Sequence, residues 1–260
     1  MSDASETPSL TGKHVVITGG GRGIGATVAD YYDQAGANIT LMGRTESSLK
    51  DVAGKLGRAS YQTADITDSA SVKRAFDAAV EQFGPVAILV NNAGAAESAP
   101  FEKTSEALWD KMLSVNLSGM FHCQQQVLAG MREAKWGRII NVVSTAGLIG
   151  YAYVTAYCAA KHGAIGLTRA LALETARDGI TVNAICPGFT ETDLLEDSIE
   201  NIMQTTGRDR AAAEKSLKAV NPQRRFIQPA EIAAMCLFLS GPGADSVTGQ
   251  ALAIAGGEVM

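Results

Sequence analysis

Cysteine is scarce in this sequence, and no two cysteines stand at a spacing typical of a metal or redox site. The chain has 260 residues and 4 cysteines with no C-x-x-C, at Cys123, Cys158, Cys186 and Cys236. This spacing excludes a zinc-binding module and a dense disulfide framework. We interpret the four thiols as small buried apolar groups and expect a protein of a reducing compartment, the cytoplasm.

Positive charge and long apolar runs are lacking as well. The 22 basic residues are outnumbered by 27 acidic ones, which gives a net charge of −5. A negative surface repels a phosphate backbone, so nucleic acid is not an expected partner. No apolar run reaches the roughly 18 residues of a membrane span, and residues 1–10 lack the basic stretch of a secretion signal. We therefore expect no membrane partner. Residues 1–10, which are small and polar, are expected to form a flexible N-terminus.

The most regular feature of the sequence is an alternation of β-branched runs with segments of helical periodicity. Hydrophobic residues make up 46% and charged residues 19%, the balance of a globular chain. Repeated βα units predict a parallel sheet with helices on both faces, within one domain of residues 11–260. The expected strands are 13–18, 38–42, 59–63, 86–90, 137–143, 180–186 and 251–255, and the expected helices are 26–34, 46–56, 69–83, 105–132, 154–177 and 229–239.

One segment, residues 188–228, interrupts this alternation. It is longer than an ordinary connection, which favours a functional role, and we predict a helical substrate lid. Two amphipathic stretches, 194–204 and 208–220, support helices there. Apolar residues at helical spacing are Leu194, Leu195, Ile199, Ile202 and Met203. A disordered insertion is the alternative.

A glycine-rich turn follows the first expected strand. Gly19, Gly23 and Gly25 lie between that strand and the first helix. Glycines at such a turn let backbone N–H groups approach a pyrophosphate closely, and the helix offers its positive N-terminal end. The spacing is G-x-x-x-G-x-G rather than G-x-G-x-x-G, so a plain structural turn is the alternative at this point.

Four further motifs follow the glycine turn in order. The five are TGGGRGIG at 18–25, NNAG at 91–94, Ser144, Tyr157-x-x-x-Lys161 and Pro187-Gly188. Together they resemble the short-chain dehydrogenase/reductase family, over the chain from about residue 10 to its end. The resemblance implies a single Rossmann-type, doubly wound α/β domain with about seven parallel strands. It also implies NAD(H) or NADP(H) as hydride carrier, a catalytic set of Asn, Ser, Tyr and Lys, and a homotetramer.

The residues themselves suit the interconversion of an alcohol and a ketone. Such a reaction needs one group that takes or gives the hydroxyl proton, and a Tyr phenol with a pKa of about 10 is poorly matched to pH 7. Lys161 lies one helical turn after Tyr157, so we expect its ammonium to favour the phenolate. Ser144 follows an apolar strand and is expected to bond the substrate oxygen. Asn116 matches the family's fourth catalytic residue, which holds a water-linked proton relay.

Arginines rather than a carboxylate mark the expected ribose site. No acid follows the second strand, where one would accept hydrogen bonds from the ribose of NAD. Arg44 stands there instead, and with Arg22 it suits the 2′-phosphate of NADP. We favour NADP(H), with NAD(H) as the alternative. The residues expected to bind the cofactor are Gly19, Arg22, Gly23, Ile24, Gly25, Arg44, Asp65, Ile66, Asn92, Ala93, Gly94, Tyr157, Lys161, Pro187, Gly188 and Thr190.

The expected pocket lacks a partner for a substrate carboxylate. Residues 184–229 resemble the 3-hydroxybutyrate dehydrogenase and 3-oxoacyl reductase branch of the family, which places polar or basic side chains where this chain has Ala96, Ala146 and Val154. An unpaired buried charge is costly, so we expect an apolar, roomy pocket that rejects short hydroxy acids. The residues expected to contact the substrate are Ala96, Ser144, Ala146, Tyr151, Val154, Tyr157 and Phe189.

We therefore predict an NAD(P)(H)-dependent oxidoreductase that interconverts a secondary alcohol and a ketone, with Tyr157 as acid and base. A 3-oxoacyl thioester and a cyclic or aromatic ketone are the expected substrates. The alternative is a catalytically silent dinucleotide-binding sensor or scaffold. Ser144 does not lie in the G-x-S-x-G of an α/β-hydrolase, and the three histidines show no metal-binding spacing, so we assign neither a hydrolase nor a metal.

Overall fold

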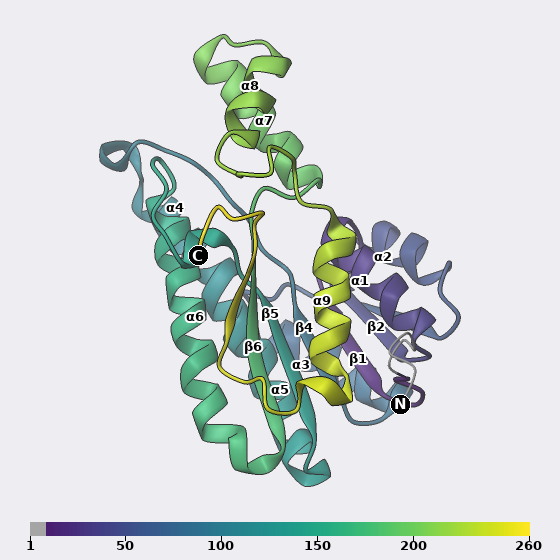
Figure 1. Ribbon diagram of the computed structural model, residues 1–260. Coiled ribbons are helices and arrows are strands. Elements are labelled where there is room, and N and C mark those ends of the chain that lie inside the picture. The colour runs from purple at the N-terminus through teal and green to yellow at the C-terminus, as the bar shows by residue number, and fades with distance from the viewer. Residues whose placement is uncertain (1–8) are drawn as a thin grey trace, which may run out of the picture.

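The computed structural model describes residues 9–260 and contains the predicted parallel sheet (Figure 1). Its seven strands follow the order β3-β2-β1-β4-β5-β6-β7. They are β1 (His14–Thr18), β2 (Asn38–Gly43), β3 (Ala59–Thr63), β4 (Ile88–Asn91), β5 (Gly137–Val142), β6 (Ile180–Pro187) and β7 (Ala251–Ile254). The doubly wound fold class is therefore confirmed.

The predicted flexible terminus, residues 1–10, falls mostly outside the described residues. Leu10 is described, and it is buried, with its N–H donated to the carbonyl of Ala35 at 2.8 Å. The folded domain thus includes Leu10, one residue earlier than predicted. Among residues 9–260, no helix combines the length and the apolar character that a membrane crossing needs.

Helices cover both faces of the sheet because its strands are apolar on both sides. Along β1, Val15 and Ile17 pack in a cluster with α1 (Gly23–Gln34) and α9 (Pro229–Ser240). Val16, between them, points to the opposite face and the second cluster. That face carries α3 (Ser69–Phe83), α5 (Gly119–Ala134) and α6 (Thr155–Thr175), and α2 (Glu46–Ala53) lies beside the β3 edge. The core is therefore two apolar layers with the sheet between them.

The expected helix over residues 105–132 is wrong as a single element. The structure divides it into α4 (Glu106–Leu113), a π-helical turn η2 (Ser114–Ser118) and α5. Ser105 caps α4 by accepting a hydrogen bond from the N–H of Leu108 at 3.1 Å. Apolar periodicity alone does not register the extra residue of a π turn, and such turns are frequent at functional sites.

Residues 188–228 form two helices, as the periodicity predicts, and the alternative of a disordered insertion is wrong. They are α7 (Asp193–Thr206) and α8 (Arg210–Lys218), which stand beyond the carboxyl edge of the sheet in Figure 1. The pair has its own apolar cluster, formed by Leu195, Ile199, Ala213 and Phe226. The remaining elements are short 3₁₀ turns: η1 (Phe101–Lys103), η3 (Thr145–Gly147), η4 (Ala176–Asp178) and η5 (Pro242–Ala244).

The strand order reverses between β1 and β4, which are neighbours at the centre of the sheet. In an open α/β sheet, the loops that leave the carboxyl ends of strands diverge at such a point and leave a crevice for ligands. The glycine turn follows β1 and the NNAG segment follows β4. Both predicted cofactor motifs therefore lie at this switch point.

Candidate active site

The predicted catalytic side chains come together where β5 and β6 end. β5 brings Ser144 to the carboxyl edge, and α6 packs along β6 with Tyr157 and Lys161 in its first two turns. The Lys161 ammonium lies 5.5 Å from the centre of the Tyr157 ring and donates a hydrogen bond to the carbonyl of Val142 at 3.3 Å. The Ser144 hydroxyl lies close enough to the Tyr157 phenol to lower its pKa. Three of the four expected residues thus form one contiguous group.

Burial dominates the electrostatics of this group. It raises the pKa of Tyr157 to about 12, although the nearby Ser144 hydroxyl acts in the opposite direction. Burial likewise lowers the pKa of Lys161 to about 8. From the sequence we expect the lysine to stabilise the phenolate; within the protein, burial is the largest effect on the pKa of Tyr157, and it raises that pKa. Tyr157 is therefore a neutral phenol at pH 7, beside a lysine that is still mostly protonated.

Asn116 is the fourth expected residue, and the structure places it in the π turn η2 with its side chain buried. Its amide donates to the carbonyls of Ala95 at 2.9 Å and Met112 at 3.0 Å, and its Oδ1 accepts from the N–H of Ala95 at 3.2 Å. A Cβ on Gly94 would lie 3.0 Å from Asn116 Oδ1 and 3.7 Å from the Lys161 ammonium. Asn116 therefore fixes the segment after NNAG against the catalytic lysine.

The glycine turn is built so that only glycine fits. Gly19 has a φ of +66°, and a Cβ on Gly25 would overlap the Gly19 carbonyl oxygen and lie 2.7 Å from the Asn92 amide. That amide donates to the carbonyls of Thr18 and Gly19 at 3.1 and 3.2 Å. The N-terminus of α1 has no side-chain cap and no acid in its first turn, so its N–H groups suit a pyrophosphate. The residues present fit a dinucleotide.

The two arginines expected at the ribose phosphate differ in their surroundings. Arg44 is exposed directly after β2. Arg22 is exposed too, and it donates to the carboxylate of Asp193 at the start of α7, at 3.0 Å. Asp65 lies after β3, where hydrogen bonds from the N–H and hydroxyl of Thr67 hold the pKa of its carboxyl below the usual range, with a smaller contribution from Arg44.

The other residues expected to bind the cofactor line the same edge. The carbonyl of Ile66 is bonded to the His122 ring at 3.0 Å. Ala93 donates its N–H to the Thr18 hydroxyl at 3.1 Å. Thr190 donates its hydroxyl to the carbonyl of Gly188 at 2.9 Å. Gly23 and Ile24 begin α1, and Pro187 ends β6.

Of the residues expected to contact substrate, Ala146 adjoins Ser144, because its N–H donates to the Ser144 hydroxyl at 3.1 Å. Ala146 is buried in η3, and Ala96 and Val154 are partly buried. Phe189 packs instead against the apolar cluster of α7 and α8. Tyr151 is held by hydrogen bonds to Thr145 at 2.8 Å and to the carboxylate of Glu258.

Sequence reasoning did not identify Glu258. One of its carboxylate oxygens is bonded to Tyr151, and the other, Oε2, is buried beside Gly188 without a hydrogen-bond partner among the described residues. Glu258 is the third-last residue of the sequence and lies outside every motif, so it gives no sequence signal. Only the path of the chain after β7 brings it to the site.

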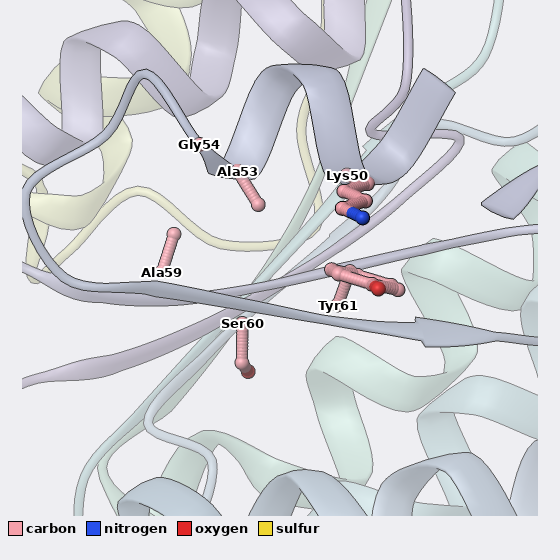
Figure 2. A pocket seen from close by; sticks show the side chains of 6 residues that line it. All are labelled: Lys50, Ala53, Gly54, Ala59, Ser60 and Tyr61. Atoms are coloured by element: carbon pink, nitrogen blue, oxygen red, sulfur yellow. The ribbon is translucent and has the colours of Figure 1, made fainter. Parts of the chain in front are cut away.

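A second hollow in the molecule lies away from this group. Figure 2 shows it between α2 and the first half of β3, with Ala59 and Tyr61 facing it and Ser60 on the other side of the strand. All of its lining residues lie within residues 50–61, so it is separate from the group around Tyr157. Residues 9–260 contain no group of three or more His, Cys, Asp or Glu side chains able to hold a metal ion.

Comparison with known proteins agrees with this geometry. Residues 13–202 match the family model of short chain dehydrogenases. The chain is 38% identical to a D-beta-hydroxybutyrate dehydrogenase of Cupriavidus necator, over 96% of this chain and 99% of the relative. It is also 38% identical to a putative ketoacyl reductase of Streptomyces coelicolor, over 93% of this chain and 95% of the relative.

Among solved structures, a variant of actinorhodin polyketide ketoreductase with NADPH superimposes with a TM-score of 0.92 and 36% identity. The match covers 95% of this chain and 97% of that one. These relatives span the whole fold rather than the dinucleotide-binding half alone, and they are named as oxidoreductases. The chain belongs to the short-chain dehydrogenase family and is an NAD(P)-dependent oxidoreductase that interconverts alcohols and ketones.

Proposed function

We propose that Tyr157 exchanges the hydroxyl proton of the substrate and that Ser144, Lys161 and Asn116 support it. The observation that carries this proposal is the group itself: a phenol whose pKa the neighbouring Ser144 hydroxyl lowers, with the Lys161 ammonium 5.5 Å from the centre of its ring. Bound NAD(P)(H) supplies or accepts the hydride. Ser144 would hold the substrate oxygen beside the phenol, since its hydroxyl lies near that phenol.

The protonation state of Tyr157 suits the reduction of a ketone directly. A neutral phenol is the form that donates a proton to the oxygen of a ketone as the carbonyl carbon accepts the hydride. Alcohol oxidation needs the phenolate, and a pKa of about 12 leaves it about five units from pH 7, or about 7 kcal/mol. The Lys161 ammonium and the positive charge of an oxidised nicotinamide both act to lower that cost.

Asn116 would act by position rather than by touching the reacting atoms. Its side chain is fully used in hydrogen bonds to Ala95 and Met112. Those bonds hold the Gly94 backbone close to the Lys161 ammonium. A proton that leaves Tyr157 toward solvent would therefore pass between Lys161 and a backbone segment whose location is set by the π turn.

NADP(H) is the proposed preference, with NAD(H) possible. Arg44 stands free in solvent at the end of β2, where a guanidinium reads a 2′-phosphate, and no carboxylate follows β2 to accept from a ribose hydroxyl. A related ketoreductase was solved with NADPH, which supports this choice.

A 3-oxoacyl thioester or a cyclic or aromatic ketone is the proposed substrate. Ala96, Ala146 and Val154 give the pocket wall no cation for a carboxylate. The relatives named ketoacyl reductase favour an acyl ketone, whereas the relatives named D-beta-hydroxybutyrate dehydrogenase favour a short hydroxy acid. We favour the acyl ketone, because a substrate carboxylate buried in this pocket without a charged partner would cost several kcal/mol of binding free energy.

A homotetramer in the cytoplasm is proposed as the working state. Among the large apolar side chains that remain exposed are Phe121 on α5, Leu173 on α6 and Phe238 on α9. Two separate faces of the sheet thus offer apolar contacts, which suits two kinds of interface. The four buried free thiols fit a reducing compartment. Light scattering after size exclusion tests the assembly, and a monomer would contradict it.

The test of the catalytic proposal combines a substrate screen with one substitution. NADPH and NADH oxidation is measured against a panel of ketones and 3-oxoacyl thioesters. Tyr157→Phe should lower kcat by about 10² or more and leave NADPH binding, followed by fluorescence, unchanged. Retained turnover in this variant would remove Tyr157 from the reaction, and no turnover of any ketone by the unaltered protein would refute the proposed function.

A further inference from the structure

The segment between Ser144 and Tyr157 joins two of the catalytic side chains. It consists of the turn η3 and the loop of residues 148–154, and α6 begins directly after that loop. Tyr153 in the loop has a φ of +68°, in the left-handed region that residues with a Cβ rarely adopt. A backbone conformation of this kind persists only where surrounding contacts hold it. The contacts that hold this loop therefore bear on the placement of both catalytic hydroxyls.

Tyr151 lies in the middle of the loop, and its hydroxyl makes two hydrogen bonds. One joins it to the hydroxyl of Thr145 at 2.8 Å, and the other joins it to the carboxylate of Glu258. A phenol has a single proton and a carboxylate only accepts, so Tyr151 donates to Glu258 and accepts from Thr145. Burial, together with the bond to Glu258, raises the pKa of Tyr151 well above its ordinary value. The hydroxyl therefore stays a donor to Glu258 at neutral pH.

Glu258 can serve as an anchor because the turn that carries it has a defined course. β7 pairs with β6, so the turn starts from the sheet. Gly256 and Gly257 then have φ values of +61° and +91°, which glycine adopts readily. A Cβ on Gly256 would overlap the side chain of Asn221, which is itself buried. The chain thus turns back to the active site, and its C-terminus lies beside the start of α6 (Figure 1).

The other partner of Tyr151, Thr145, belongs to the same turn as Ser144. The carbonyl of Ser144 accepts the N–H of Gly147 at 2.9 Å, which closes the turn. A closed turn moves as a unit, so a bond to the Thr145 side chain also restrains Ser144. Tyr151 therefore joins the turn at one end of the loop to the sheet-borne C-terminal segment, six residues before Tyr157.

We propose that Glu258 is a positioning residue for the reaction: through Tyr151 it holds the loop whose two ends carry Ser144 and Tyr157. The inference rests on the proposed function. Glu258 acts through Tyr151 and not by contact with the substrate, and it keeps the two catalytic hydroxyls at a spacing that one substrate oxygen can bridge. A displacement of about 1 Å can cost about 100-fold in rate, so loss of this tie lowers kcat while the glycine turn still binds the cofactor.

A double-mutant cycle on Glu258 and Tyr151 tests this role. Glu258→Ala and Tyr151→Phe remove the same hydrogen bond, so each should lower kcat about 10-fold for a ketone that the unaltered protein reduces, with the Kd of NADPH unchanged within about 2-fold. The double variant should be no slower than the slower single variant, because the two side chains act as one unit. Glu258→Gln still offers an oxygen to Tyr151 and should keep at least about half of kcat.

Tyr61→Phe is the matched control. It removes the hydroxyl of another tyrosine that is bonded to a glutamate, Glu46, at 3.3 Å, on the strand β3 at the opposite edge of the sheet. This variant should keep the kcat of the unaltered protein. Hydrogen exchange gives a readout besides activity: residues 145–154 should exchange at least about 10-fold faster in Glu258→Ala and at the original rate in Glu258→Gln.

The possible outcomes separate this inference from the proposed function. Full kcat in Glu258→Ala, additive losses in the double variant, or a loss in Glu258→Gln as large as that in Glu258→Ala would each overturn the positioning role while the proposed function stands. If Glu258→Ala does not fold, Tyr151→Phe and Glu258→Gln decide, and full kcat in Tyr151→Phe overturns the role. An unaltered protein that reduces no ketone overturns both.

Discussion

Lys161 carries an ammonium group in surroundings that oppose charge. Burial lowers its pKa from 10.5 to about 8, so at pH 7 the folded protein holds a proton that the site disfavours. The 2.5-unit difference corresponds to about 3 kcal/mol of lost stability. The loss of stability is complete below pH 8. It disappears as the pH rises from 8 to 10.5, because in that range the folded protein releases the proton while the unfolded chain keeps it.

Lys161→Met should therefore stabilise the protein at pH 7 by about 2–3 kcal/mol while abolishing turnover. Urea unfolding at pH 7 and at pH 10 measures the effect, and the advantage of the variant should shrink at the higher pH. Lys55→Met, at an exposed position after α2, should change stability by less than about 0.5 kcal/mol. A Lys161→Met variant that unfolds at lower urea would show that the ammonium is a net stabiliser.

Arg44 should decide the choice of cofactor. Arg44→Ala removes a guanidinium that only NADP(H) can use, so we expect the KM for NADPH to rise about 10-fold or more and the KM for NADH to change less than about 2-fold. Steady-state rates with both cofactors at low and moderate salt provide the measurement. An equal rise for both would mean that Arg44 stacks on the adenine ring instead.

At the residue scale, local patterns in the sequence were enough to single out the three grouped side chains, those of Ser144, Tyr157 and Lys161. The patterns are a hydroxyl residue at the end of an apolar strand and a lysine one helical turn after a tyrosine. The pKa of Tyr157 was not predictable, because burial is a property of the packed core. The ion pair of Arg22 with Asp193 and the approach of Glu258 to Tyr151 were not predictable either. Both join segments far apart in the sequence.

At the scale of elements, the glycine turn connects β1 to α1 with no room for a side chain. Gly25→Ala would drive a methyl group into the Gly19 carbonyl, which cannot move without breaking its bond to Asn92. We expect a loss of NADPH affinity of at least about 10-fold and a fall of about 2 kcal/mol or more in stability.

Gly130→Ala is the matched control for that substitution. Gly130 lies inside α5, and its Cβ would make only an ordinary contact with Pro85 at 3.5 Å. The free energy of unfolding of this variant should rise by up to about 1 kcal/mol, since alanine favours the helical conformation more than glycine does. Fluorescence titration and urea unfolding of both variants give the comparison, and a Gly25→Ala variant with normal affinity would contradict the assigned cradle.

Four elements of the core are joined by one buried amide. Asn141 on β5 accepts from Asn91 of β4 at 2.9 Å and from Gln124 of α5 at 3.0 Å, and it donates to Thr168 of α6 at 2.8 Å. Asn141→Ala would leave the side chains of Asn91, Gln124 and Thr168 without their hydrogen-bond partner. We therefore expect the free energy of unfolding to fall by about 3 kcal/mol or more. Urea unfolding measures it, with exposed Gln125→Ala as control; a loss under about 1 kcal/mol would show that water replaces the amide.

Most element types were predictable because each βα unit carries its own periodicity, but several boundaries were not. Residues 23–25 belong to α1 although glycines favour a turn, since the helix begins where the backbone is free to bond a ligand. The π turn at Asn116 arises from its side-chain bonds to Ala95, which no periodic pattern reveals. Boundaries set by tertiary contacts are those that sequence periodicity misses.

For the whole molecule, the two helices α7 and α8 should behave as a separate layer. The two ends of the segment that carries them pair with each other at the Thr190–Ile227 bridge, outside the sheet, and the helices touch the rest of the molecule through exposed polar contacts such as Arg22–Asp193 and Asn201–Ser98. Such contacts contribute little to stability. The layer should therefore open more readily than the core strands.

Hydrogen exchange followed by mass spectrometry tests this. Residues 193–218 should exchange at least about 10-fold faster than β1, β4 and β5, and saturating NADPH should slow them. Asp193→Asn should speed exchange in α7 and leave the sheet unchanged. Exchange as slow as that of the core would exclude a movable lid.

The central position of β1 also has a consequence for the synthesis of the chain. Val16 pairs with Thr40 on one side and with Leu89 on the other. Because β1 leaves the ribosome before β4, it keeps one open edge until β4, Ile88–Asn91, has followed it out of the exit tunnel. During that interval an apolar strand with unpaired N–H and C=O groups is accessible to chaperones and to other nascent chains, and a release of the chain before residue 91 would yield a fragment prone to aggregation.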